Sequence, residues 1–315
     1  MFKELLISGA IVLLSGYRYY MHKSEDIECV SYEVKSRKIP KVFDKFKIVQ
    51  ISDLHNRSFG IDNSILLEKI DKLKPDIVCI TGDLIDGANE DFSIALKLID
   101  ELSRKYQVYH IIGNHEQKVM FNKYKELYKE YFKQLNTKNI INLENEMVKI
   151  ERDSKCINIY GLVIPYKYYP YLFNRNYKNK SLDFNKYDVE KRLGKIDNRE
   201  YNILLVHTPF FFDGYSKWGA DLVLAGHVHG GIIRLPIKGG LLSPNREFFP
   251  KYDLGEYNMG KSTMILSKGL GGSKVLPRVN CKPEIVEITL KSKYTLSITD
   301  SVYSGAGCGT RTHTL

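Results

Sequence analysis

Short runs of hydrophobic residues, each bounded by polar positions, set the expected framework of the chain. Five such runs are Phe46–Ser52, Asp76–Asp83, Val108–Glu116, Tyr201–Pro209 and Asp221–Gly230. Unbroken apolar runs of this length are typical of strands that are buried on both faces. Between the first three runs the apolar positions recur every three or four residues, as in Leu66, Ile70 and Leu73 and then in Phe92, Ala95, Ile99 and Leu102. Strands that alternate with helices predict a parallel sheet covered by helices.

The remaining elements are predicted from weaker patterns. A charged helix is expected over Met120–Leu135, paired strands at Met147–Ile150 and Cys156–Val163, and further strands at Ser31–Val34, Thr263–Ser267 and Glu284–Leu290. The segment Pro165–Arg199 is rich in Tyr and Lys and is expected to leave the core, part loop and part helix, as a lid, a membrane-facing patch or a surface excursion. No linker rich in Gly, Pro or Ser divides the chain, so one domain is predicted over residues 31–292, with a disordered tail over residues 300–315.

The N-terminus differs from the rest of the chain. Leu5–Tyr17 carries no charge and is flanked by Lys3 and Glu4 on one side and by Arg18 and Lys23 on the other. A full membrane span needs about 20 apolar residues, and this stretch is shorter, while no cleavage site of the secretory type follows it. We predict a signal-anchor over residues 1–23 that places the protein at the cell membrane, with a cleaved signal or a buried helix of a soluble fold as alternatives. Positive charges on both sides leave the orientation in the membrane open.

Composition and charge narrow the classes of partner. The 315 residues are 43% hydrophobic and 12% aromatic, which is typical of a globular protein. Lys and Arg number 47 against 37 Asp and Glu, giving a net charge of +10 that would suit a polyanion. The basic residues form no dense run, so most of them are interpreted as solvated surface and nucleic acid is not favoured. The five cysteines form no CxxC pair, which favours unpaired thiols.

Polar residues able to bind a metal follow each of the five apolar runs. They are Asp53 and His55, Asp83, Asn114 and His115, His207, and finally His227 and His229. Because the carboxyl ends of parallel strands meet at one edge of a sheet, these side chains are expected to converge. Each motif alone also has a structural explanation: Asp53 could cap a helix, Gly82–Asp86 could be a turn and His207 could be a core histidine. The occurrence of all five motifs, each at the end of a strand, predicts a metal centre. His227 and His229 would point to the same face of the strand if that segment is extended.

The chemistry of this set indicates the kind of metal. Imidazole, carboxylate and amide ligands without a thiolate suit Mn²⁺, Fe or Zn²⁺, and the set is too rich in imidazole for Ca²⁺ or Mg²⁺. The set has too many ligands for one ion. We therefore expect two divalent or trivalent ions that share a bridging carboxylate, an arrangement used in phosphate chemistry.

The same motifs carry a resemblance to a known family. Asp53-Leu54-His55, Gly82–Asp86, Gly113–Glu116, His207 and Gly226–His229 resemble, in this order, the calcineurin-like metallophosphoesterase superfamily. The sequence from Gly226 onward, "GHVHGGIIRLPIKGG", further resembles the membrane-associated bacterial branch of the YaeI and YkuE kind. The resemblance implies a four-layer α/β/β/α fold, an α+β sandwich with the metal site at the carboxyl ends of the strands. One departure stands beside the site, since relatives usually have Gln where this chain has Ile232.

The resemblance also implies a role for each residue. Asp53, His55 and His229 would bind one metal, Asn114, His207 and His227 the second, and Asp83 would bridge the two. His115 would protonate the leaving oxygen while a hydroxide shared by the ions attacks phosphorus, so His115 and Asp83 are the catalytic candidates. Asp86 would orient the loop or a ligand histidine.

Together these features predict a dinuclear metal phosphohydrolase tethered to the membrane. Its substrate would be a phosphomonoester, a phosphodiester or a pyrophosphate in a small molecule or a lipid-linked molecule. One alternative is a nuclease or nucleotide phosphodiesterase, which the positive charge favours but the absence of a clustered basic stripe does not. A second alternative is a scaffold that keeps the fold and binds partners, which is disfavoured because no ligand of the set is missing. The oligomeric state stays open.

Overall fold

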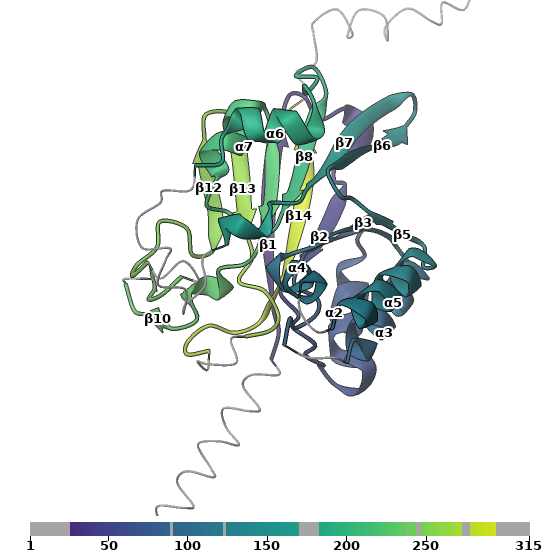
Figure 1. Cartoon of the computed structure of the whole chain (residues 1–315). Helices are drawn as coiled ribbons and strands as arrows, with labels where there is room; N and C mark the ends of the chain where they lie inside the picture. The colour runs from purple at the N-terminus through teal and green to yellow at the C-terminus, as the bar shows by residue number, and fades with distance from the viewer. Residues whose placement is uncertain are drawn as a thin grey trace, which may run out of the picture.

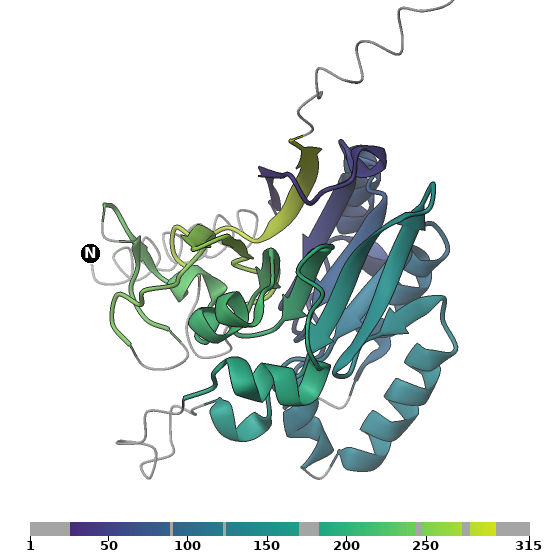
Figure 2. The same ribbon diagram turned by 90° about the horizontal axis from the view of Figure 1, so that it is seen from above.

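The chain folds into two sheets that lie face to face with helices on both outer sides. A computed structural model describes residues 26–88, 91–121, 124–169, 183–237, 239–243, 247–272 and 278–293. Each sheet has six strands, and the helices cover their outer faces (Figure 1). Seen from above, the blue and teal helices of the first half lie on one side and the green helices of the second half on the other (Figure 2). These four layers confirm the predicted α/β/β/α fold.

The first sheet joins the first half of the chain to its last strand. Its order is β1 (Glu28–Ser36), β14 (Glu284–Ser292), β2 (Lys47–Ile51), β3 (Ile77–Thr81), β4 (Gln107–Ile111) and β5 (Ile140–Asn142). β2 to β5 are parallel, β14 runs antiparallel to β2, and β1 runs parallel to β14. The first and last strands are therefore neighbours in the sheet.

The second sheet is built from the middle of the chain. Its order is β12 (Gly255–Met259), β13 (Ser262–Leu266), β9 (Leu222–Ala225), β8 (Tyr201–Val206), β7 (Lys155–Leu162) and β6 (Glu146–Arg152). The four central strands are parallel, and β12 and β6 are antiparallel edge strands. The predicted pairing of the strands around residues 147–150 and 156–163 is confirmed.

Three hydrophobic layers hold the molecule together. One lies between the first sheet and α2 (Ser64–Leu73), α3 (Ser93–Ser103) and α5 (Lys125–Asn136). Another lies between the second sheet and α6 (Lys186–Leu193) and α7 (Phe212–Trp218). The third fills the space between the two sheets with side chains such as Ile48, Ile203 and Leu224. Strands that are buried on both faces explain why the apolar runs of the sequence do not alternate.

Several predicted elements need correction. The sequence predicted one parallel sheet, but the five runs are divided between two mixed sheets because a strand buried on both faces has the same pattern in either one. The fifth run ends as a strand at Ala225, and the third ends at Ile111, after which Asn114–Met120 forms the short helix α4. The helix expected over residues 120–135 is α5, which begins five residues later than predicted, and Met120 is the last residue of α4.

The two ends of the chain lie outside the described residues. The predicted anchor of residues 1–23 and the predicted tail of residues 300–315 are therefore not described. Residues 170–182, inside the Pro165–Arg199 segment, are not described either. The described part of that segment contains a 3-10 turn at Tyr166–Tyr168 and the helix α6, which agrees with the prediction of part loop and part helix. The expectation that it leaves the core is wrong for this part, because Tyr169, Phe184 and Val189 are buried in the hydrophobic layer outside the second sheet. Among the helices of the described residues, none has the length and apolar character needed to cross a bilayer.

A cavity variant tests the importance of the layer between the sheets. Ile203→Ala removes apolar atoms from a fully buried position of β8, and such changes cost about 2–5 kcal/mol. Urea denaturation should show a loss of unfolding free energy in this range. The control is Met147→Ala, on the exposed face of β6 in the same sheet, which should change the unfolding free energy by less than about 0.5 kcal/mol. Equal effects of the two variants would contradict this packing.

Candidate metal centre

The predicted site residues all lie where the carboxyl edges of the two sheets meet. The first sheet contributes the loops that follow β2, β3 and β4, and the second contributes the loops that follow β8 and β9. The residues on these loops are Asp53, His55, Asp83, Asn114, His115, His207, His227 and His229. The rule that carboxyl ends of parallel strands form the functional edge therefore holds, although two sheets supply the strands.

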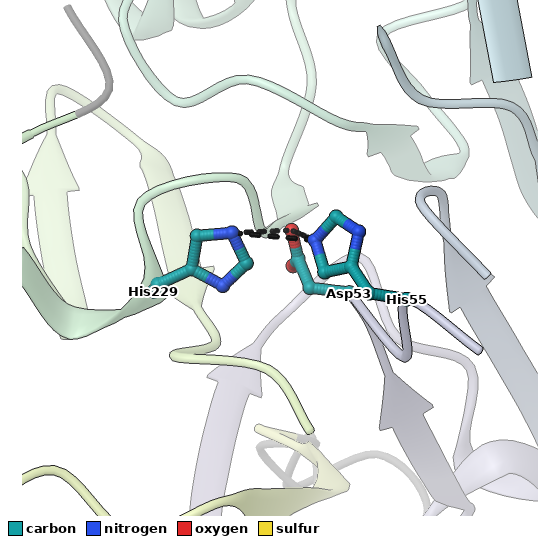
Figure 3. A group of neighbouring side chains, drawn as sticks. All are labelled: Asp53, His55 and His229. Atoms are coloured by element: carbon teal, nitrogen blue, oxygen red, sulfur yellow. Dashed lines mark hydrogen bonds and ion pairs between the residues drawn. The ribbon is translucent and has the colours of Figure 1, made fainter. Parts of the chain in front are cut away.

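The first group consists of Asp53, His55 and His229. Their potential ligand atoms all lie within 4.8 Å of one another. The Nε2 atoms of His55 and His229 are 3.3 Å apart, and they lie 3.9 Å and 3.8 Å from the Oδ1 atom of Asp53. Figure 3 shows the two imidazole rings pointing toward each other beside the Asp53 carboxylate. Three residues from both sheets thus surround one point.

The second group consists of Asp83, His207 and His227, whose potential ligand atoms also lie within 4.8 Å of one another. The Nε2 atom of His207 is 3.0 Å from the Oδ2 atom of Asp83. The same Oδ2 atom lies 3.9 Å from the Nε2 atom of His55 in the first group. Asp83 therefore stands between the two groups.

Asn114 has a polar atom with no hydrogen-bond partner among the described residues. It is the first residue of α4, and its side chain is buried. Its Oδ1 atom is buried and accepts no hydrogen bond from any of the described residues. A buried amide oxygen normally accepts a hydrogen bond. An ion or water bound beside Asn114 would supply the partner that this oxygen lacks.

Five residues of the site have a left-handed backbone. The φ angles of Asp53, His55, Asp83, His227 and His229 are 52°, 51°, 54°, 75° and 53°. Non-glycine residues rarely adopt this conformation, and strained backbone of this kind gathers at functional sites. The segment is therefore not extended at His227 and His229, and the expectation that they share one face of a strand is wrong. Their imidazoles reach different groups because the chain turns sharply at both residues.

Hydrogen bonds across the two sheets fix the position of the loops. The backbone N–H of His227 donates to the Asp53 carboxylate, at 3.1 Å and 3.0 Å from its two oxygens. The Nδ1 atom of His207 lies 2.7 Å from the backbone oxygen of Thr81, at the end of β3. The imidazole therefore donates through Nδ1 and leaves Nε2 free to face the centre.

Close backbone packing leaves room only for glycine at two positions. A Cβ atom on Gly113 would lie 2.2 Å from the Oδ1 atom of Asp83, and one on Gly226 would lie 2.0 Å from the Oγ atom of Ser52. Either distance is far below van der Waals contact. Both glycines therefore allow the loops to approach the two carboxylates.

Glu116 supports two of the loops from behind. Its buried carboxylate accepts hydrogen bonds from the backbone N–H groups of Asp83, Ile85 and Gly113, at 2.9 Å, 3.2 Å and 2.9 Å. Burial and the nearby Asp83 carboxylate raise the pKa of Glu116 to about 7. The motif Gly113–Glu116 thus supplies both a candidate ligand and the group that holds the Asp83 loop.

The electrostatics of the centre favour a cation. Burial lowers the pKa of His207, but the carboxylates of Asp83 and Asp53 outweigh it and raise the pKa to about 10. Burial, followed by the charge of His115, lowers the pKa of His55 to about 3. Burial likewise lowers the pKa of His227 and His229. His55, His227 and His229 are therefore neutral, which is the form in which imidazoles bind metals, whereas His207 holds a proton that a bound metal would replace.

His115 lies at the more open side of the centre. Its ring is 4.5 Å from that of His55, measured between centroids, and its side chain is partly exposed. The Nδ1 atom accepts a hydrogen bond from the backbone N–H of Gly87 at 3.0 Å and lies 3.6 Å from the Oδ1 atom of Asp86. Asp86 thus contacts His115 itself.

Three further residues at the centre were not found from the sequence. The buried Tyr169 ring lies 5.1 Å from that of His227, measured between centroids. The Cys281 thiol donates to the backbone oxygen of His229 at 3.3 Å. Arg278 donates to the backbone oxygens of Lys268, Gly269 and Gly271, in the loop that contacts Asp53. These residues lie outside the metal-binding motifs, so no local pattern marked them.

Comparisons with known proteins agree with this geometry. Residues 46–231 match the family described as "Calcineurin-like phosphoesterase". The chain is 29% identical to the uncharacterized metallophosphoesterase YkuE of Bacillus subtilis, over 91% of this chain and 94% of that protein. It is 23% identical to the uncharacterized metallophosphoesterase YkoQ of the same organism, over 89% of this chain and 97% of that protein. It is also 24% identical to a zebrafish (Danio rerio) protein named "Transmembrane protein with metallophosphoesterase domain", over 92% of this chain and 63% of that one.

The matched segment covers more than half of the chain and contains all the residues of the two groups. The fold, the convergence of the motifs and the match lead to one conclusion. The chain belongs to the calcineurin-like phosphoesterase family and is a metal-dependent phosphoester hydrolase.

Proposed function

We propose that this protein hydrolyses phosphate esters or pyrophosphates with two metal ions held between its two sheets. The observation that carries the proposal is a row of neighbouring groups of potential ligand atoms, long enough for two ions. Asp53, His55 and His229 form the group at one end, and Asp83, His207 and His227 form the group at the other. His55 and Asp83 also form a group with His115, which connects the two. Asn114 completes the second set, since its buried Oδ1 atom has no partner within the described protein. Asp83, whose Oδ2 atom faces both groups, would be the ligand that the two ions share.

The residues present fit such ions. The set offers imidazole nitrogens and carboxylate and amide oxygens without a thiolate, which favours Mn²⁺, Fe or Zn²⁺. When bound, two ions supply Lewis-acid chemistry: they polarise the phosphate and lower the pKa of the attacking water, so that it loses a proton more easily. The chain itself holds the Asp53 carboxylate in place through the bond from the His227 N–H, and the His207 imidazole through the bond to the Thr81 carbonyl.

His115 is the candidate for proton transfer to the leaving oxygen. Because its Nδ1 atom accepts from the Gly87 N–H, the neutral ring carries its proton on Nε2. The ring lies beside the first group and is more exposed than the ligand histidines, so a substrate can reach it. The carboxylate of Asp86 lies on the Nδ1 side and would stabilise the ring when both nitrogens are protonated.

The proposal includes a tether to the cell membrane through residues 1–23. The uncharged stretch Leu5–Tyr17 between Lys3 and Arg18 supports it. The name of the zebrafish relative describes that protein as transmembrane. A tethered enzyme would meet phosphorylated lipids as well as soluble esters, so a lipid-linked phosphate is proposed as one substrate class.

Metal content tests the division of ligands. The full chain loaded with Mn²⁺ should bind two ions per chain. His229→Ala and Asn114→Ala should each lower this to about one, and Asp83→Asn should reduce both, because a bridging carboxylate serves both ions. Elemental analysis after gel filtration measures the stoichiometry. His110→Ala is the control, since His110 is a buried histidine on β4 whose Nδ1 atom lies 2.8 Å from the Oδ1 atom of Asn142 and which belongs to none of the ligand groups.

Two ions bound by both single variants would contradict the division. No ion bound by the parent chain would favour the scaffold alternative.

Leaving-group dependence tests His115. His115→Ala should slow hydrolysis of phenyl phosphate by roughly 10²–10⁴-fold, the usual contribution of general acid catalysis. Hydrolysis of p-nitrophenyl phosphate should fall much less, because its leaving group needs no proton. The kcat of each ester is measured in the parent and the variant, again with His110→Ala as the control. Equal losses for the two esters would refute proton donation by His115.

Cell fractionation tests the tether. The full chain should sediment with membranes and resist extraction by salt, because apolar insertion does not depend on ionic strength. A chain that lacks residues 1–23 should move to the soluble fraction in large part. Recovery of both chains in the soluble fraction would show that no anchor exists.

A further inference from the structure

Exposed hydrophobic side chains gather beside the metal centre. Eleven large hydrophobic residues are exposed within the described part of the chain, and five of them are Leu235, Ile237, Phe248, Phe249 and Val279. Ile237 and Phe248 are 106% and 70% exposed. Single exposed apolar residues need no explanation, but a group on one face marks a contact surface.

These five residues belong to one connected piece of structure. β10 (Arg234–Leu235) pairs with β11 (Gly239–Gly240), Leu242 forms a bridge with Phe248, and Ile233 forms a bridge with Val279. The backbone N–H of Phe249 donates to the oxygen of Leu241 at 3.1 Å. We call the described residues of this piece, 232–237, 239–243 and 247–249 with Val279, the rim flap. Its exposed side chains are held in place by backbone bonds.

The rim flap is attached directly to the metal centre. It begins three residues after His229, and the Arg234 guanidinium donates to the backbone oxygen of Gly230 at 3.1 Å. Cys281, two residues after Val279, donates to the backbone oxygen of His229. In Figure 1, β10 lies at the lower end of the molecule, and the β6–β7 hairpin lies at the upper end. The apolar surface and the site therefore share one end of the fold.

The chain enters the fold at this same edge. Lys282 forms an ion pair with Asp26 at 2.5 Å, and the Glu28 N–H donates to the backbone oxygen of Pro283 at 2.8 Å. Residues 1–25 precede this point and include the apolar stretch Leu5–Tyr17. A membrane that holds this stretch would therefore lie near the rim flap rather than at the β6–β7 end.

We propose that the rim flap docks on a phospholipid bilayer, with Ile237 and Phe248 entering the headgroup region, so that the metal centre faces the membrane. This inference rests on the proposed tether. A tethered domain meets the bilayer at high effective concentration, so a small apolar surface suffices for a second contact. The exposed Lys251 and the net charge of +10 favour anionic lipids. The ligand class is a lipid surface, and the substrates best presented to this centre carry their phosphate at that surface.

Fluorescence of single tryptophan substitutions tests the docking. The chain has one tryptophan, Trp218, which is buried, so the parent provides the background signal. Phe248→Trp and Ile237→Trp are made in the full chain and reconstituted in vesicles of phosphatidylcholine and phosphatidylglycerol. The matched control is Tyr187→Trp, at a position that is 69% exposed on α6. Vesicles with brominated acyl chains quench a tryptophan that reaches the lipid.

The expected result is a blue shift and the loss of most of the added emission for the tryptophans at positions 248 and 237, with little change at position 187. Chains that float with the vesicles but show no quenching at positions 248 and 237 would overturn the docking and leave the tether intact. Equal quenching at all three positions would also overturn it. Chains that do not float would overturn both docking and tether. Hydrolysis of a soluble ester, measured on the same samples, shows separately whether the proposed catalytic function holds.

Discussion

The site depends on the way in which the two sheets meet at their carboxyl edges. Asp53 follows a strand of the first sheet, and its carboxylate accepts the backbone N–H of His227, which follows a strand of the second. His207 makes the reverse connection, from the second sheet to the Thr81 carbonyl of the first. These two contacts carry little energy compared with the apolar layer between the sheets, but they fix its edges relative to each other. Both of the proposed ligand groups draw residues from the two sheets.

The sequence was sufficient for much of the fold because its strongest signals are local. Buried strands appear as short apolar runs, and the polar residues that follow them mark the loops of the site. The division of those runs between two sheets could not be derived from pattern alone, because a strand such as β8 is covered on both faces in either arrangement. The four-layer fold came instead from the order of the motifs and the family that they resemble.

The candidate site was predictable to different degrees. Every residue placed in the two groups was expected from its position after a strand, since imidazole and carboxylate groups are conspicuous in an apolar context. The turns at His227 and His229 were not expected, because a left-handed backbone at a non-glycine residue has no sequence signal. Tyr169 and Arg278 were missed for another reason. They reach the centre from segments distant in sequence, and only the folded chain brings them there.

The left-handed turns make the rim of the sheets locally frustrated. Each strained residue costs about 1–3 kcal/mol, and the apolar layers behind the rim must support that cost. A ligand that binds only the ordered rim stabilises it by mass action, so metal uptake and local order are thermodynamically linked. The rim should therefore exchange its amide hydrogens faster than the strands beneath it when ions are scarce. Metal supply would then control not only the chemistry of this protein but also how long its active conformation persists.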